Sequence, residues 1–129
     1  VAALLRHPLV TAVHHPSIPE HPGHELARRQ QSGWGSLVSF EVAGGRPVVE
    51  ALLPQLEYFT LAESLGGVES LVAHPETMTH ASMDADARET AGIGSGLLRL
   101  SVGIEDAADL VADLKHALDH AGEARYARC

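Results

Sequence analysis

Two six-residue segments of alternating polarity constrain the fold of this chain more than any other feature. Residues 37–42 and 97–102 place apolar side chains at every second position. Because successive side chains of a strand point to opposite faces of a sheet, each segment predicts a strand with one apolar face. The apolar positions are Val38, Phe40 and Val42 in the first segment and Leu98, Leu100 and Val102 in the second. A sheet built from such strands needs a cover of helices on one side only.

The clearest helix of the sequence supplies part of that cover. Residues 106–121 carry an apolar stripe at helical spacing, formed by Ala107, Leu110, Val111, Leu114, Leu118 and Ala121. Acidic residues at its start suit the helix dipole. Gly122 is expected to end the helix, and residues 123–129 are expected to form a frayed tail.

Six weaker segments complete the prediction. Residues 9–13 and 57–61 are typical of strands, and a helix is expected over residues 47–53. Pro22 is expected to open a short helix through Arg29, and Asp84 to cap another through Glu89. Residues 68–73 favour a short apolar helix or turn. Residues 1–122 therefore predict one α+β domain, with a mostly antiparallel four- or five-stranded sheet and helices packed on one face.

Composition excludes several classes of protein. The chain has 129 residues, which suits a single domain, and a net charge of −8, which disfavours nucleic acid and anionic lipid as partners. Its one cysteine, Cys129, allows no intramolecular disulfide. Apolar runs are too short to cross a membrane, and no secretory pattern opens the chain, so we expect a cytoplasmic protein.

Nine histidines raise the question of a metal site. Four of them, His14, His15, His21 and His24, lie within eleven residues, and neutral imidazole is a common metal ligand. Their spacing matches no metal-binding pattern, and no glutamate follows the first histidine of the helical pair His116 and His120. We therefore expect loop and surface histidines without a metal site. A histidine-rich metal carrier remains an alternative that metal content after dialysis tests.

Two other features suggest an anion site. Gly66 and Gly67 follow a predicted strand and are suited either to presenting N–H groups to an anion or to a tight turn. Arg99 lies in the middle of a largely apolar strand. An arginine there is explained equally well by an edge position, by a structural salt bridge or by a clamp on a ligand carboxylate. The residues alone leave these alternatives open.

Several motifs of the chain resemble one enzyme family. They are FTLAESLGGVESL at residues 59–71, MTHAS at residues 78–82, LRLSVGIED at residues 98–106 and HPGHELARRQ at residues 21–30. In their order along the chain and in their spacing, these motifs resemble the C-terminal part of the pyridoxal-phosphate (PLP) enzymes of Cys/Met metabolism, which include cystathionine gamma-synthase and cystathionine gamma-lyase. The resemblance covers residues 5–121.

The resemblance implies the C-terminal small domain of a fold-type I PLP enzyme. In that family a larger N-terminal domain of the same polypeptide holds the cofactor and supplies the Schiff-base lysine. The only lysine here, Lys115, matches no lysine of the family, and Val1 opens a segment that looks like the end of a helix. The resemblance therefore implies that this chain has no catalytic or cofactor-binding residue of its own and is inactive when isolated, and the histidine spacing predicts no metal-binding residue. The full-length parent is expected to be a homotetramer.

The same resemblance implies four substrate-binding residues. Arg99 matches the arginine that binds the substrate α-carboxylate, and Ser64 matches a residue that helps to hold it. Glu63 matches a glutamate near the distal end of the substrate, and Thr79 matches a threonine close to the carboxylate. The parent is expected to be a lyase or transferase of transsulfuration that acts on small sulfur amino acids. The alternative is a stand-alone amino-acid-binding or regulatory module without catalysis. The sequence does not separate gamma-synthase from gamma-lyase.

Overall fold

The computed structural model describes residues 1–78 and 80–126. Its strands are β1 (Val10–His14), β2 (Leu37–Val42), β3 (Thr60–Leu61), β4 (Leu71–Ala73) and β5 (Leu97–Ser101). Its helices are α1 (Ala2–Leu5), α2 (His24–Gln30), α3 (Arg46–Leu52), the 3-10 helix η1 (Leu53–Gln55), α4 (Ala85–Thr90) and α5 (Ala107–Tyr126).

The five strands form one sheet with the order β1-β2-β5-β4-β3. Neighbouring strands are antiparallel except for β3 and β4, which are parallel. This arrangement confirms the α+β prediction and its mostly antiparallel sheet. The strand β5 lies in the middle, because β2 pairs with it on one side and β4 on the other.

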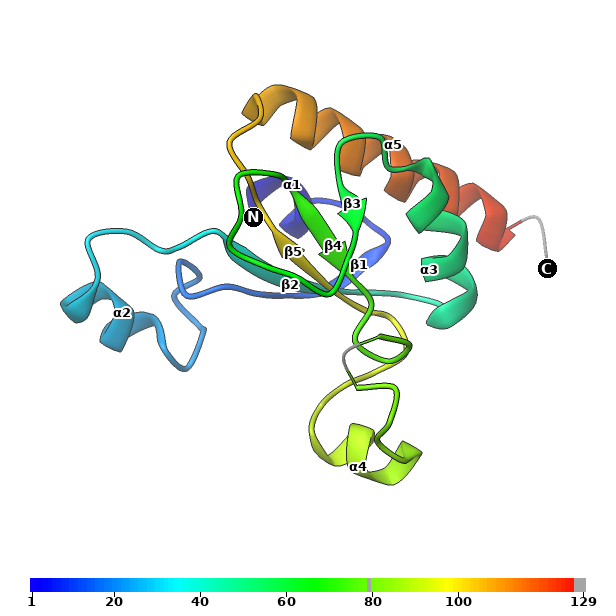
Figure 1. Ribbon diagram of the computed structural model, residues 1–129, viewed down its shortest axis with the longest axis horizontal. Helices are drawn as coiled ribbons and strands as arrows, with labels where there is room; N and C mark the ends of the chain where they lie inside the picture. The colour runs from blue at the N-terminus through cyan, green and yellow to red at the C-terminus, as the bar shows by residue number, and fades with distance from the viewer. Residues whose placement is uncertain (79, 127–129) are drawn as a thin grey trace.

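One face of the sheet is closed by helices. Figure 1 shows α5 running along one side of the sheet next to α3. The alternating apolar residues of the sequence lie in this interface, where Phe40, Leu98 and Leu100 are at most 1% exposed. They pack with Leu52 of α3 and Leu118 of α5 in one apolar core. Burial of this kind is the main source of stability in a domain of this size.

The other face of the sheet is covered only in part. Along β2 and β5 it carries Ser39, Glu41 and Arg99, which are all partly exposed. The loop of residues 62–69, between β3 and β4, lies at one end of this face and is bonded to β5. The segments that carry α2 and α4 extend away from the sheet (Figure 1).

Three local predictions were wrong. Residues 71–73 form strand β4 instead of a helix or turn, because they pair with β5 in the interior of the sheet. The helix α2 begins at His24, two residues after Pro22. The helix α5 continues through Gly122 to Tyr126, so the first residues of the expected frayed tail are helical. A glycine inside a helix costs only about 1 kcal/mol, which a helix packed along one side tolerates. Residues 127–129 of the expected tail lie outside the described residues.

Candidate functional site

The strand β5 positions Arg99 on the open face of the sheet. Its neighbours Leu98 and Leu100 are buried against the helices, so Arg99 points to the opposite side, as the alternation predicts. Its cross-strand partners are Ser39 on β2 and Ala73 on β4. Both side chains are small, and they leave room above the central strand for the long side chain of arginine.

The guanidinium group of Arg99 contacts the loop of residues 62–69. Its Nη2 donates hydrogen bonds to the backbone carbonyl oxygens of Glu63, at 3.1 Å, and of Ser64, at 3.4 Å. The structure therefore brings together three of the four residues that the resemblance singled out. The side chains of Glu63 and Ser64 are exposed. The fourth residue, Thr79, lies outside the described residues.

Among the residues whose side chains the structure describes, no carboxylate forms an ion pair with Arg99. Its position in the middle of the sheet also removes the explanation by an edge strand. Arginine has five N–H donors, and within this part of the chain those on Nε and Nη1 donate to no protein group. The site is thus a partly buried cation whose charge the described residues leave uncompensated.

A hydrogen bond to Ser101 fixes the turn of this loop. The N–H of Gly66 donates to the hydroxyl oxygen of Ser101, at 2.8 Å. Ser101 is 1% exposed and lies two residues after Arg99 on the same strand. Gly66 has a φ of +77°, a left-handed conformation that glycine adopts at little cost. A tight turn was one of the two alternatives that the Gly66-Gly67 pair left open, but the contact of Gly66 with Ser101 was not predicted.

Glu105 and Ser70 fasten the other end of the loop. The carboxylate of Glu105 accepts the N–H and the hydroxyl of Ser70, both at 2.8 Å, and the Ser70 oxygen accepts the N–H of Gly103 at 2.9 Å. The N–H of Ser70, with the N–H of Glu105 itself and the Ser70 hydroxyl, lowers the pKa of Glu105. At Gly103 a Cβ atom would collide with the carbonyl oxygen of Val68, so the two chain segments approach closely.

Three anchoring residues of the site were not predicted from the sequence. Ser70, Ser101 and Glu105 contact residues that lie 33 to 35 positions away in the chain. The one available signal was the alternation of β5, which places Ser101 on the same face as Arg99.

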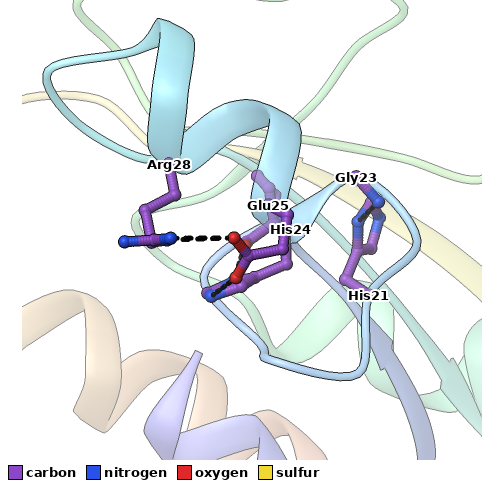
Figure 2. A network of polar contacts seen from close by, with 6 residues as sticks. His21, Gly23, His24, Glu25 and Arg28 are labelled. Carbon is purple, nitrogen blue, oxygen red and sulfur yellow. Dashed lines mark hydrogen bonds and ion pairs between the residues drawn. The ribbon is translucent and has the colours of Figure 1, made fainter.

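The histidine-rich segment before and within α2 forms a separate polar network (Figure 2). His21 accepts the N–H of Gly23 through Nδ1, at 3.0 Å, and Arg28 donates to the carboxylate of Glu25, at 2.9 Å. His24 bonds the carbonyl of Pro16 at 2.7 Å, and its ring stacks on that of Trp34 with a centroid distance of 4.9 Å. These histidines have local partners and do not converge on one point.

The described residues contain neither a metal-binding cluster nor a membrane-spanning helix. Among the side chains that the structure describes, no three histidine, cysteine, aspartate or glutamate residues are arranged to hold a metal ion. Within the same residues, no helix has the length and apolarity that a membrane span requires.

The position of Lys115 does not fit a Schiff-base site. Its Nζ pairs with the carboxylate of Asp119 at 2.5 Å, and its side chain is 65% exposed. It lies on α5, which packs on the opposite face of the sheet from Arg99. This chain therefore offers no lysine near the candidate site.

Comparisons with known proteins agree with the motifs. A family model described as Cys/Met metabolism PLP-dependent enzyme matches residues 1–119. The chain is 54% identical over 116 residues to the cystathionine gamma-synthase of Escherichia coli K12. The aligned residues make up 90% of this chain and 30% of that protein. The chain is 50% identical over 116 residues to the cystathionine gamma-lyase of Dictyostelium discoideum, again 90% of this chain and 30% of that protein.

A solved structure shares the fold. The crystal structure of cystathionine gamma-synthase from Xanthomonas oryzae pv. oryzae, in complex with cystathionine, matches with a TM-score of 0.89 and 56% identity. The match covers 95% of this chain and 32% of that one. The chain thus spans about a third of the length of the proteins it resembles.

Proposed function

The chain belongs to the Cys/Met metabolism PLP-dependent enzyme family, and from this premise we propose that it is the C-terminal, substrate-binding domain of a transsulfuration enzyme. The parent would be of the cystathionine gamma-synthase or gamma-lyase type and would act on small sulfur amino acids. The cofactor PLP would be held by an N-terminal domain of the same polypeptide. Two observations support this division of the enzyme into two domains. The chain matches only about a third of the length of each relative, and its one lysine, Lys115, is exposed.

The observation that carries the proposal is the uncompensated guanidinium of Arg99. A partly buried cation without a carboxylate partner is costly, and the α-carboxylate of an amino acid would supply the missing charge. Arginine forms two parallel charge-assisted bonds to such a group, and a central strand holds the side chain rigidly. Clamping the carboxylate would orient the rest of the substrate for reaction elsewhere in the enzyme.

The neighbouring residues have supporting roles in this proposal. The loop carbonyls of Glu63 and Ser64 hold the guanidinium, and the exposed side chain of Ser64 is proposed to help to hold the ligand carboxylate. Glu63 is proposed to face the distal end of the substrate, and Thr79 to lie close to the carboxylate. We further propose a cytoplasmic, homotetrameric parent, as in the family that the motifs resemble.

The test of the carboxylate clamp uses the full-length polypeptide that carries this chain. Arg99→Ala is expected to lower kcat/KM by roughly one and a half to four decades, the equivalent of losing about 2–5 kcal/mol from a desolvated charge pair. Arg99→Lys should recover only part, since an ammonium group cannot form the planar fork. Unchanged kinetics in Arg99→Ala, or a protein that unfolds and keeps its KM in the folded fraction, would contradict the clamp.

A second test concerns the division between domains. The 129-residue chain alone should turn over no cystathionine, and PLP added to it should leave no absorbance that survives dialysis. A stoichiometric adduct that depends on Lys115, together with turnover, would show that the chain is an enzyme by itself. Binding of an amino acid that requires Arg99 but no other domain would favour the stand-alone module. Assays of the full-length protein with cystathionine, and with an O-acyl-homoserine plus cysteine, separate lyase from synthase.

A further inference from the structure

We propose that Ser70, Ser101 and Glu105 form a polar lock that positions the guanidinium of Arg99. The lock holds the loop of residues 62–69 against β5, so that the carbonyls of Glu63 and Ser64 fix one orientation of Nη2. Its consequence for substrate binding rests on the proposed function, but the lock itself does not.

The loop of residues 62–69 is anchored at two points. Ser101 bonds its turn at Gly66, while Glu105 and Gly103 bond its end at Ser70. A further bond, from the N–H of Ile104 to the carbonyl of Val68 at 2.9 Å, joins the loop to the chain that follows β5. The segment between Gly66 and Ser70 is therefore held at both ends by the segment that directly follows Arg99.

The serine at each anchor point is buried. Ser70 is fully buried and Ser101 is 1% exposed, so their hydroxyl groups bond protein groups in place of water. Removing one partner of a buried hydrogen bond loses the bond and leaves the other group unsatisfied. Burial of polar groups at both anchor points favours one loop position over alternatives.

The loop supplies the hydrogen-bond acceptors that hold Arg99. Within the described ranges, Arg99 donates to no group except the carbonyls of Glu63 and Ser64. Both residues belong to the locked loop, and Ser64 lies two residues before the anchored Gly66. If the loop moves, both acceptors move together and the guanidinium is free to rotate. Ser101 and Glu105 are thus positioning residues that act through Arg99.

The direct test is the rotation of the Arg99 guanidinium about the Nε–Cζ bond, measured by NMR in ligand-free protein labelled with 15N-arginine. Rotation should be slow in the wild type and about 2- to 10-fold faster in Ser101→Ala, as expected for the loss of one hydrogen bond. The matched control is Ser36→Ala, because Ser36 is exposed and its hydroxyl bonds no group in the described part of the chain. If Ser101→Ala folds poorly, Glu105→Gln loosens the lock at its other, partly exposed end.

Kinetics of the full-length polypeptide test the consequence. Ser101→Ala should raise KM by about 2- to 10-fold with little change in kcat, because it weakens binding before and during reaction alike. In an Arg99→Ala background the same substitution should add less than about 2-fold, since its effect passes through Arg99. A purely structural serine would give the same change in both backgrounds.

The outcomes separate the inference from the proposed function. If Arg99→Ala leaves KM unchanged, the proposed function fails, and the rotation rate alone decides whether the lock exists. If rotation in Ser101→Ala or Glu105→Gln equals that of Ser36→Ala, the lock is refuted, even when Arg99 binds substrate.

Discussion

The two faces of β5 are made by alternate residues of one strand, yet they differ in almost every physical property. Leu98 and Leu100 are buried in an apolar core beneath α3 and α5. Arg99, between them, is partly exposed, charged and held by two carbonyl groups of a loop. The closed face contributes the free energy that folds the chain, while the open face carries polar groups that have few partners, such as the two loop carbonyls bonded by Arg99.

The difference teaches where stability and ligand binding can be separated. Substitutions on the closed face should change the free energy of unfolding, and substitutions on the open face should change binding with little effect on folding. Because the same rigid strand carries both faces, the core also keeps the binding residues in place.

The largest expected effect breaks the closed face. Phe40 is fully buried between the sheet and the helices, and Phe40→Ala should lower the free energy of unfolding by about 3–5 kcal/mol. Urea unfolding measures this loss, with Arg99→Ala as the comparison on the open face, where a change below about 0.5 kcal/mol is expected. Equal losses of unfolding free energy in the two variants would show that the two faces do not differ in their contribution to stability.

A buried carboxylate on α5 gives the next effect. Asp113 is 7% exposed and accepts the N–H groups of Glu57, at 2.9 Å, and Tyr58, at 3.0 Å, just before β3. Asp113→Ala removes two hydrogen bonds to a charged group and should cost about 2–4 kcal/mol in unfolding free energy. Asp113→Asn keeps an acceptor and should cost less. If Asp113→Ala leaves the free energy of unfolding unchanged, only apolar contacts hold this side of the molecule.

The smallest expected effect is a pH dependence of the free energy of unfolding, which arises from the Glu105 carboxylate. Hydrogen bonds from Ser70 hold the pKa of Glu105 below its ordinary value of 4.5, so the unfolded chain binds a proton more readily than the folded one. The stabilising contribution is complete above the ordinary pKa and is lost as pH falls through the lowered value. The stability difference between wild type and Glu105→Gln should therefore shrink between pH 6 and about pH 3.

Urea unfolding at several pH values measures this difference, and Glu20→Gln in an exposed loop is the matched control. A difference that stays constant with pH, or one that grows toward acid, contradicts the role assigned to the Glu105 carboxylate.

The sequence predicted the fold where one face of an element is apolar and the other is not. The strands β2 and β5 and the body of α5 followed from that pattern. Strand β4 was missed because Leu71, Val72 and Ala73 are all buried, and a short apolar run without alternation does not distinguish a strand from a helix. The end of α5 was misplaced because Gly122 is tolerated inside a helix that continues past it.

The candidate site was only partly predictable from the residues. Alternation placed Arg99 opposite the core, and the family motifs named Glu63 and Ser64. Neither indicated that the carbonyls of those two residues, and not their side chains, hold the guanidinium. Contacts such as Gly66 with Ser101 join segments far apart in the chain, and no local spacing encodes them.

The central claim is that Arg99 binds the α-carboxylate of an amino acid. The most direct measurement compares inhibition of the full-length polypeptide by an amino acid and by the amine that lacks only the carboxylate, in wild type and in Arg99→Ala. The account predicts that the substitution weakens inhibition by the amino acid by about 30-fold or more, the lower end for a desolvated charge pair, and leaves inhibition by the amine within about 2-fold. Equal weakening of both inhibitors, or of neither, would contradict it.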